Sequence, residues 1–136
     1  MKYLSLFLIT IMLYACNKDD DIPQLHSEIY GTWHLKTSMN GIDGSTTYYP
    51  EDTGEHIALV IKTNDSLHVI LNDKIENSGT YEIIQKESLI YRKEKDFIYY
   101  KNADNTDTFE FIIKLESDNL IIEQDAYDGQ GWLFQR

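Results

Sequence analysis

Apolar and polar residues alternate along most of the chain from Tyr30 onward, which is the pattern of β-strands that bury one face. In the first such segment, one face carries Trp33, Leu35, Thr37 and Met39. The alternation predicts eight strands, at Trp33–Met39, Ile57–Lys62, Leu67–Leu71, Thr80–Ile84, Leu89–Lys101, Phe109–Leu115, Leu120–Gln124 and Trp132–Arg136.

Short runs of Gly, Asn, Asp and Ser, such as Asn72-Asp73, separate most of these segments and favour antiparallel hairpins. The segment Leu89–Lys101 carries the charged run Arg92–Asp96 in its middle. This run is either a bend in one long strand or a turn between two, so the count is eight or nine. Residues Pro23 to Tyr30 predict a single helical turn that ends at Gly31.

Eight sequential antiparallel strands, each with one apolar face, predict an all-β fold closed into an up-and-down barrel, because closure leaves no exposed edge. An open sandwich of two sheets is the alternative. By parity with Trp33, the expected inward residues are Leu35, Ile57, Leu59, Ile61, Leu67, Val69, Leu71, Tyr81, Ile83, Phe109, Phe111, Ile113, Leu120, Ile122, Trp132 and Phe134.

The start of the chain has a different pattern: Met1-Lys2 precedes the uncharged, mainly apolar run Tyr3–Tyr14. Twelve helical residues span about 18 Å, less than the roughly 30 Å of a bilayer core, so the run predicts a secretion signal. Leu13-Tyr14-Ala15-Cys16 resembles the bacterial lipobox. The resemblance implies cleavage before Cys16 and its lipidation with diacylglycerol and an acyl chain such as palmitate, which anchors the protein to a membrane. An ordinary signal peptide is the alternative.

The run Lys18-Asp19-Asp20-Asp21 lies directly behind Cys16. It is similar to the acidic export signal of some gram-negative lipoproteins, which implies a lipid-anchored protein on the outer face of the outer membrane. The alternative is a solvated tether, because like charges extend a chain. The sequence thus predicts three parts: a signal peptide (residues 1–15), a lipidated cysteine with an acidic tether (16–24) and one barrel domain (25–136).

The chain has a net charge of −11, and loss of Lys2 with the signal peptide would make it −12. This charge repels phosphate backbones, so nucleic acid is not an expected partner. The single cysteine excludes an internal disulfide framework.

The segment Gly31-Thr32-Trp33 resembles the G-x-W motif of lipocalins. Ser78–Tyr81, Leu120–Ile122 and Phe134–Arg136 are similar to elements of small bacterial lipocalin-like domains, and the resemblance covers residues 25–136, although the later Thr-Asp-Tyr element of lipocalins is missing. It implies that Trp33 seals one end of the barrel against Arg136, whose guanidinium stacks on the indole. Gly31, Trp33 and Arg136 would then be structural.

The one long connection, Asn40 to Glu55, carries Tyr48 and Tyr49. In lipocalins the corresponding loop covers the cavity mouth, so the resemblance implies a small apolar or amphipathic ligand. The candidate ligand contacts are Tyr48, Tyr49, Tyr81 and Tyr99; because Tyr99 alternates with Tyr100, at most one of these two points inward. Alternatively, bulky inward residues fill the barrel, and the protein is a non-catalytic structural or interaction lipoprotein that contacts another envelope protein.

The four histidines are scattered without metal-ligand spacing, and the acidic turns Asn102–Asp107 and Asp125–Gly129 do not match a calcium loop. Nucleophile elbows and phosphate-cradling glycine loops are absent from the sequence, and no pair of carboxylates stands out among twenty-three. We therefore expect no catalytic residues, no metal and no cofactor.

Overall fold

The computed structural model describes residues 24–40, 45–48, 53–104 and 106–136. They form a short helix, α1 (Gln24–Glu28), and nine strands: β1 (Gly31–Met39), β2 (Thr46–Tyr48), β3 (Ile57–Ile61), β4 (Ser66–Leu71), β5 (Lys74–Glu87), β6 (Glu94–Asn102), β7 (Thr108–Glu116), β8 (Asn119–Glu123) and β9 (Gly131–Gln135).

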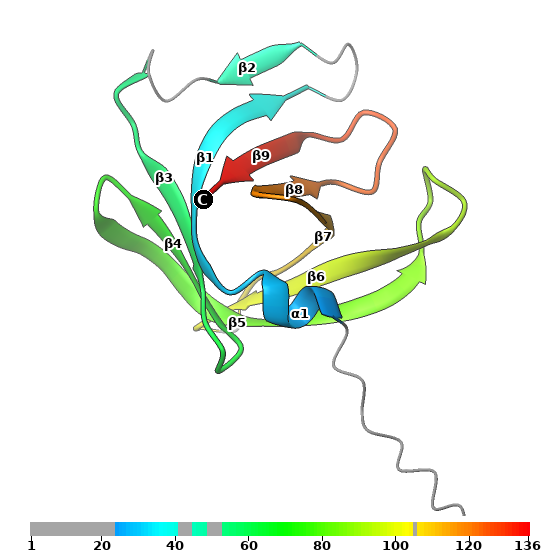
Figure 1. Ribbon diagram of the computed structural model, residues 1–136, viewed down its shortest axis with the longest axis horizontal. Coiled ribbons are helices and arrows are strands. Elements are labelled where there is room, and N and C mark those ends of the chain that lie inside the picture. Colours follow the sequence, from blue (N-terminus) through cyan, green and yellow to red (C-terminus); the bar gives the residue numbers. More distant parts are fainter. Residues whose placement is uncertain (1–23, 41–44, 49–52, 105) are drawn as a thin grey trace, which may run out of the picture.

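Eight of these strands, β1 and β3 to β9, close into an antiparallel barrel (Figure 1). Each strand pairs with the next in the chain, and β9 returns to pair with β1. The predicted eight-stranded up-and-down barrel is confirmed, and so is the helical turn before its first strand. Closure between β9 and β1 excludes the two-sheet sandwich. The barrel matches a lipocalin-like architecture.

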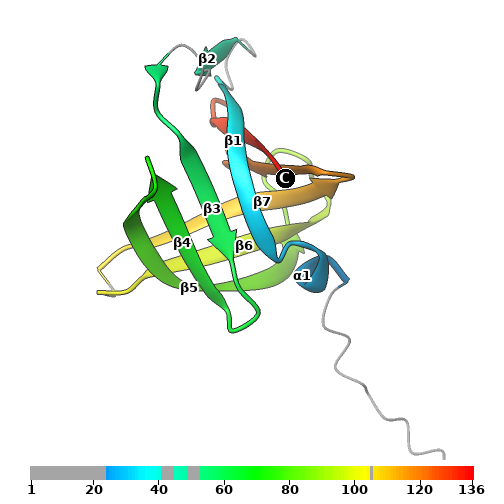
Figure 2. The same cartoon turned by 60° about the vertical axis from the view of Figure 1, so that its left-hand side comes forward.

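Strand β1 closes the barrel by pairing on both of its edges. Gly31 to His34 pair with β3, and His34 to Met39 pair with β9. The far end of β1 also pairs with β2, which lies in the long connection where no strand was predicted. In both views β2 and α1 lie on opposite sides of the barrel (Figures 1 and 2).

A β-bulge at Lys36 changes the facing of β1. The register with β9 shifts at this residue, and beyond it Ser38 pairs with Trp132, a residue that packs against the core. Side chains of paired antiparallel residues share a face, so Ser38 faces inward while Thr37 and Met39 face outward. The expectation that Thr37 and Met39 share the face of Trp33 is therefore wrong. The alternation of apolar and polar residues does not show where a bulge inserts an extra residue, here Lys36, into a strand.

Strand β5 is much longer than predicted. Its first half pairs with β4 and its second half with β6, and Gly79 itself has partners in both strands. The predicted strand Leu89–Lys101 begins too early, because residues 89–93 form the turn between β5 and β6. The end of β5, the turn after it and the start of β6 form a hairpin, residues 84–96, that we call the arm.

The barrel interior holds the core. Its buried residues are Ile29, Trp33, Leu35, Leu59, Ile61, Leu67, Tyr81, Ile98, Tyr100, Ile113, Leu120, Ile122 and Phe134. All predicted inward residues belong to this core or pack against it, except Leu71 and Phe109. Among the described residues, no helix has the length and apolar character needed to cross a membrane.

Candidate functional site

One end of the barrel is closed by α1 and the residues of the G-x-W segment. Trp33 is fully buried, and its indole Nε1 donates a 2.7 Å hydrogen bond to the carbonyl oxygen of Ile29. The Arg136 guanidinium carbon lies 4.2 Å from the centre of the Trp33 ring, and Nη2 donates to the carbonyl oxygen of Glu28. Gly31 has φ +132°, which L side chains rarely adopt, where the chain leaves α1 for β1. Together these contacts tie the helix to the barrel.

Tyr81 belongs to this closed end. Its side chain is buried, its hydroxyl donates a 3.3 Å hydrogen bond to the carbonyl oxygen of Lys62, and its ring lies 5.6 Å from that of His26. Burial, followed by the neighbouring Tyr30 and Asp65, raises the pKa of Tyr81 above its ordinary value. Tyr81 is therefore a neutral core residue on the helix side of the barrel and does not line the cavity described next.

A cavity of about 290 Å³ lies inside the barrel. It is lined by Leu35, Ile57, Leu59, Leu67, Val69, Asn77, Ile98, Tyr100, Phe109, Phe111, Ile122, Trp132 and Phe134. The lining residues nearest the closed end, such as Leu67 and Phe134, are buried, whereas Phe109 is 42% exposed. The cavity thus opens at the end away from α1.

The cavity wall carries one polar pair. The Tyr100 hydroxyl donates a 2.8 Å hydrogen bond to Oδ1 of Asn77, and both residues line the cavity. Burial, and then the negative charge of Asp104, raises the pKa of Tyr100, so its phenol stays neutral. Tyr99 does not line the cavity and lies under Lys86, whose Nζ is 5.8 Å from its ring. Of the alternating pair, Tyr100 is the one that reaches the interior.

Aromatic rings form one side of the cavity. The Tyr100 and Phe109 rings lie 6.2 Å apart and the Phe109 and Phe111 rings 6.4 Å apart, each pair close to parallel. Trp132 meets Phe111 edge to face at 5.6 Å. The rings therefore continue from the half-exposed Phe109 to the buried Tyr100 on one side and to the partly buried Phe111 and Trp132 on the other.

Three further predicted residues cannot be placed. The backbone of Tyr48, in β2, pairs with that of Ser38 in β1. The side chain of Tyr48 lies outside the described part of the structure, as do the residues Tyr49 and Cys16. The two residues that form the polar pair in the cavity wall, Asn77 and Tyr100, were not among the predicted ligand residues. The sequence did not point to Asn77, because this residue precedes the predicted strand Thr80–Ile84 and lies within β5 only in the structure.

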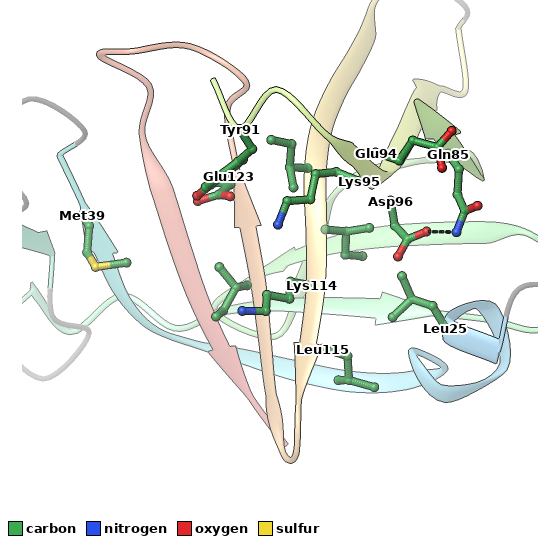
Figure 3. A pocket seen from close by; sticks show the side chains of 13 residues that line it. Leu25, Met39, Gln85, Tyr91, Glu94, Lys95, Asp96, Lys114, Leu115 and Glu123 are labelled. Carbon is green, nitrogen blue, oxygen red and sulfur yellow. Dashed lines mark hydrogen bonds between the residues drawn. The ribbon is translucent and has the colours of Figure 1, made fainter. Parts of the chain in front are cut away.

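A second cleft, of about 500 Å³, lies between the arm and strands β7 and β8 and reaches Leu25, Ile113 and Leu115 of the core (Figure 3). It exists because β6 and β7 pair only as far as Phe97 and Ile112 and then diverge. Several of its polar groups already have partners: Gln85 donates to Asp96 at 3.0 Å, and Lys114 forms an ion pair with Glu116. Since buried apolar surface and convergent polar groups define ligand sites better than size, we favour the inner cavity.

Asp125 fixes the tip of the arm. Its carboxylate accepts hydrogen bonds from Ser88 Oγ at 2.6 Å, Leu89 N at 2.8 Å and Ile90 N at 3.2 Å. Burial raises the pKa of Asp125, but these three hydrogen bonds and the nearby Lys86 outweigh it, so the pKa lies below its usual value. The sequence suggested only a hydrophilic hairpin tip here, because the partners of Asp125 lie more than thirty positions away.

Across the described ranges, no three His, Cys, Asp or Glu side chains are grouped so that they could hold a metal ion. Comparison of the chain with protein-family models, curated proteins and solved structures found no match. The geometry provides a mainly apolar, open-ended cavity with one neutral polar pair in its wall.

Proposed function

We propose that this protein is a cell-envelope lipoprotein whose barrel binds a small apolar or amphipathic molecule. The cavity of about 290 Å³ carries the proposal. Ligand pockets run from about 300 Å³, and an apolar cavity of about 150 Å³ already holds benzene. The cavity therefore has room for a molecule about twice as large as benzene.

The same observation weighs against the alternative of a barrel filled by its own side chains. The inward residues are bulky, yet space remains between the buried floor at Leu67 and the half-exposed mouth at Phe109. A core built only for stability is packed without such space.

The envelope location rests on the sequence. The lipobox-like segment ending at Cys16 supports a lipid anchor in the outer membrane, and Lys18–Asp21 supports display on the cell surface. The tether joins the barrel at α1, the closed end, so the cavity mouth lies at the end of the barrel away from the anchor. Its partners are then the membrane, through the lipid, and a small molecule that enters from the opposite side.

Saturable binding of a neutral fluorescent probe, N-phenyl-1-naphthylamine, to the mature chain carrying Cys16→Ser tests the cavity. Val69→Phe places extra volume in the cavity wall and should abolish binding. Val60→Phe is the matched control, because Val60 does not line the cavity. If the probe binds both variants equally, or does not bind the unsubstituted barrel, the ligand-binding proposal is wrong.

The anchor is tested separately in cells. Cys16→Ser should move the protein from the membrane to the soluble fraction, and protease treatment of intact cells should remove the barrel of the unsubstituted protein. Membrane retention of the Cys16→Ser chain contradicts lipidation, and full protection from protease contradicts surface display.

A further inference from the structure

We propose that the ligand is an uncharged, flat, ring-containing molecule with one hydroxyl or carbonyl group, which hydrogen-bonds to the Asn77–Tyr100 pair. This inference rests on the proposed function, because it describes what the inner cavity selects. Three features of the cavity support it: the unused bonding capacity of the pair, the absence of charge in the lining, and the aromatic wall.

The Asn77–Tyr100 pair has bonding capacity left for a ligand. Tyr100 uses its one hydroxyl proton on Asn77, which leaves its oxygen free to accept. Within the described part of the chain, the amide nitrogen of Asn77 donates no hydrogen bond. A carbonyl can accept from this nitrogen, and a hydroxyl can in addition donate to the Tyr100 oxygen. All other lining residues are apolar apart from the indole N–H of Trp132, which can only donate, so the pair is the one place in the lining that can both donate to and accept from a ligand.

The electrostatics of the cavity disfavour an anionic ligand at the Asn77–Tyr100 pair. The lining contains no Lys, Arg, His, Asp or Glu, so an ionised group would be buried without a counter-ion. The negative charge of Asp104 contributes to the raised pKa of Tyr100, and it also repels a carboxylate at this position. The net charge of −11 opposes anions at longer range as well. A fatty acid whose carboxylate reaches the pair is therefore disfavoured.

The aromatic wall favours rings over flexible chains. The Tyr100, Phe109 and Phe111 rings succeed one another nearly in parallel, and Trp132 adds an edge. Flat rings pack well against aromatic side chains and lose little conformational entropy on binding, whereas an alkyl chain must be ordered bond by bond. The volume of about 290 Å³ matches a molecule of about two fused rings.

Four probes separate these features when titrated into the mature Cys16→Ser chain by calorimetry: 2-naphthol, naphthalene, 2-naphthoate and 1-decanol. We expect 2-naphthol to bind about three- to tenfold more tightly than naphthalene, since one hydrogen bond corresponds to about that factor. We expect 2-naphthoate to bind at least tenfold more weakly than 2-naphthol, and 1-decanol to bind more weakly than 2-naphthol.

A double variant assigns the effect to the polar pair, because either residue alone can still hydrogen-bond a hydroxyl group. Tyr100→Phe combined with Asn77→Leu should lower the affinity for 2-naphthol to that for naphthalene and leave the affinity for naphthalene unchanged. Tyr81→Phe is the matched control, because it removes a tyrosine hydroxyl from the same barrel outside the cavity. Circular dichroism of each variant verifies the fold, and the naphthalene affinity provides an internal reference in case a variant disturbs the cavity itself.

The results distinguish failure of this inference from failure of the proposed function. Equal affinities for 2-naphthol and naphthalene, or a 2-naphthol affinity that the double variant leaves unchanged, overturn the polar pair while the apolar cavity stands. Preferred binding of 1-decanol or 2-naphthoate overturns the ligand class. If none of the four probes binds and N-phenyl-1-naphthylamine also fails, the proposed function itself is wrong.

Discussion

Gly79, where β5 pairs with both β4 and β6, gives a sharp test of how the barrel is built. A Cβ added at Gly79 would overlap the carbonyl oxygen of Lys101 and would lie 2.8 Å from its carbonyl carbon and from Cε2 of Tyr100. Ordinary contacts between carbon atoms lie at about 3.5 to 4.0 Å. Because two of these three atoms are backbone, rotation of a side chain cannot relieve the overlap, and β5 and β6 must move apart.

The cost of Gly79→Ala follows from that separation. Overpacking costs about 1 to 3 kcal/mol, and loss of about two backbone hydrogen bonds between β5 and β6 adds about 0.5 to 1.5 kcal/mol each. The total of about 2 to 6 kcal/mol is a large part of the 5 to 15 kcal/mol that stabilises a typical domain. For a domain of this size, the melting temperature should fall by about 10 to 30 °C.

Urea denaturation followed by tryptophan fluorescence and circular dichroism measures this loss in the mature chain. Gly131→Ala is the matched control, since a Cβ there meets its nearest neighbour, Met39 Cε, at an ordinary 3.8 Å. The control should stay within about 1 kcal/mol of the parent, on the stabilising side, because alanine restricts the unfolded chain. A Gly79→Ala variant as stable as the parent, or equal losses in both variants, would refute the close approach of β5 and β6.

Other predictions concern the closed end, the arm and one turn. Arg136→Ala should lower the free energy of unfolding by about 1 to 2 kcal/mol, because it removes the stacking on Trp33 and the hydrogen bond to Glu28. Asp125→Asn should destabilise the chain at neutral pH: the pKa of Asp125 is lowered in the folded state, so its stabilisation is present above the ordinary carboxyl pKa and is lost as the pH falls through the lowered value. Asp73→Gly should stabilise by up to about 1 kcal/mol, because Asp73 holds φ +65° in the β4–β5 turn.

Each of these predictions has a contrary result in the same denaturation assay. An unchanged stability of Arg136→Ala, with Arg136→Lys as the charge-preserving control, would mean that the closed end does not depend on the stacked guanidinium. A stability difference for Asp125→Asn that persists unchanged into strong acid would show that the charge of the carboxylate is not what holds the arm. A destabilised Asp73→Gly variant would show that the aspartate side chain matters more than its backbone conformation.

The sequence predicted the barrel well because alternation with period two and short turns are local signals. Strands β3, β4, β7, β8 and β9 begin and end within one residue of their predicted bounds. The errors fall where a distant partner decides the structure. The bulge at Lys36 is imposed by pairing with β9, and the length of β5 by pairing with β4 and β6 in turn.

The candidate site was predictable only in outline. Closure of eight strands with bulky inward residues indicated an apolar interior, but whether space remains depends on the packing of side chains from eight different strands. Alternation required that at most one of Tyr99 and Tyr100 face inward without saying which. The pairing of Tyr100 with Asn77 joins two strands across 23 positions, a contact that no local pattern encodes.

Closure of the barrel through β1 also sets the order of events in folding. His34 pairs with Gln135, about 100 residues further along the chain, and joining segments so far apart costs about 4 kcal/mol of chain entropy. Pairing of neighbouring strands carries a smaller entropic cost, so the sheet should grow from its hairpins and form the β1–β9 seam last. Until β9 has been synthesised, one side of β1 has no partner, and the incomplete sheet exposes edges that can pair with other chains. The seam is therefore the slow step and the point at which an unfinished barrel is most prone to aggregation.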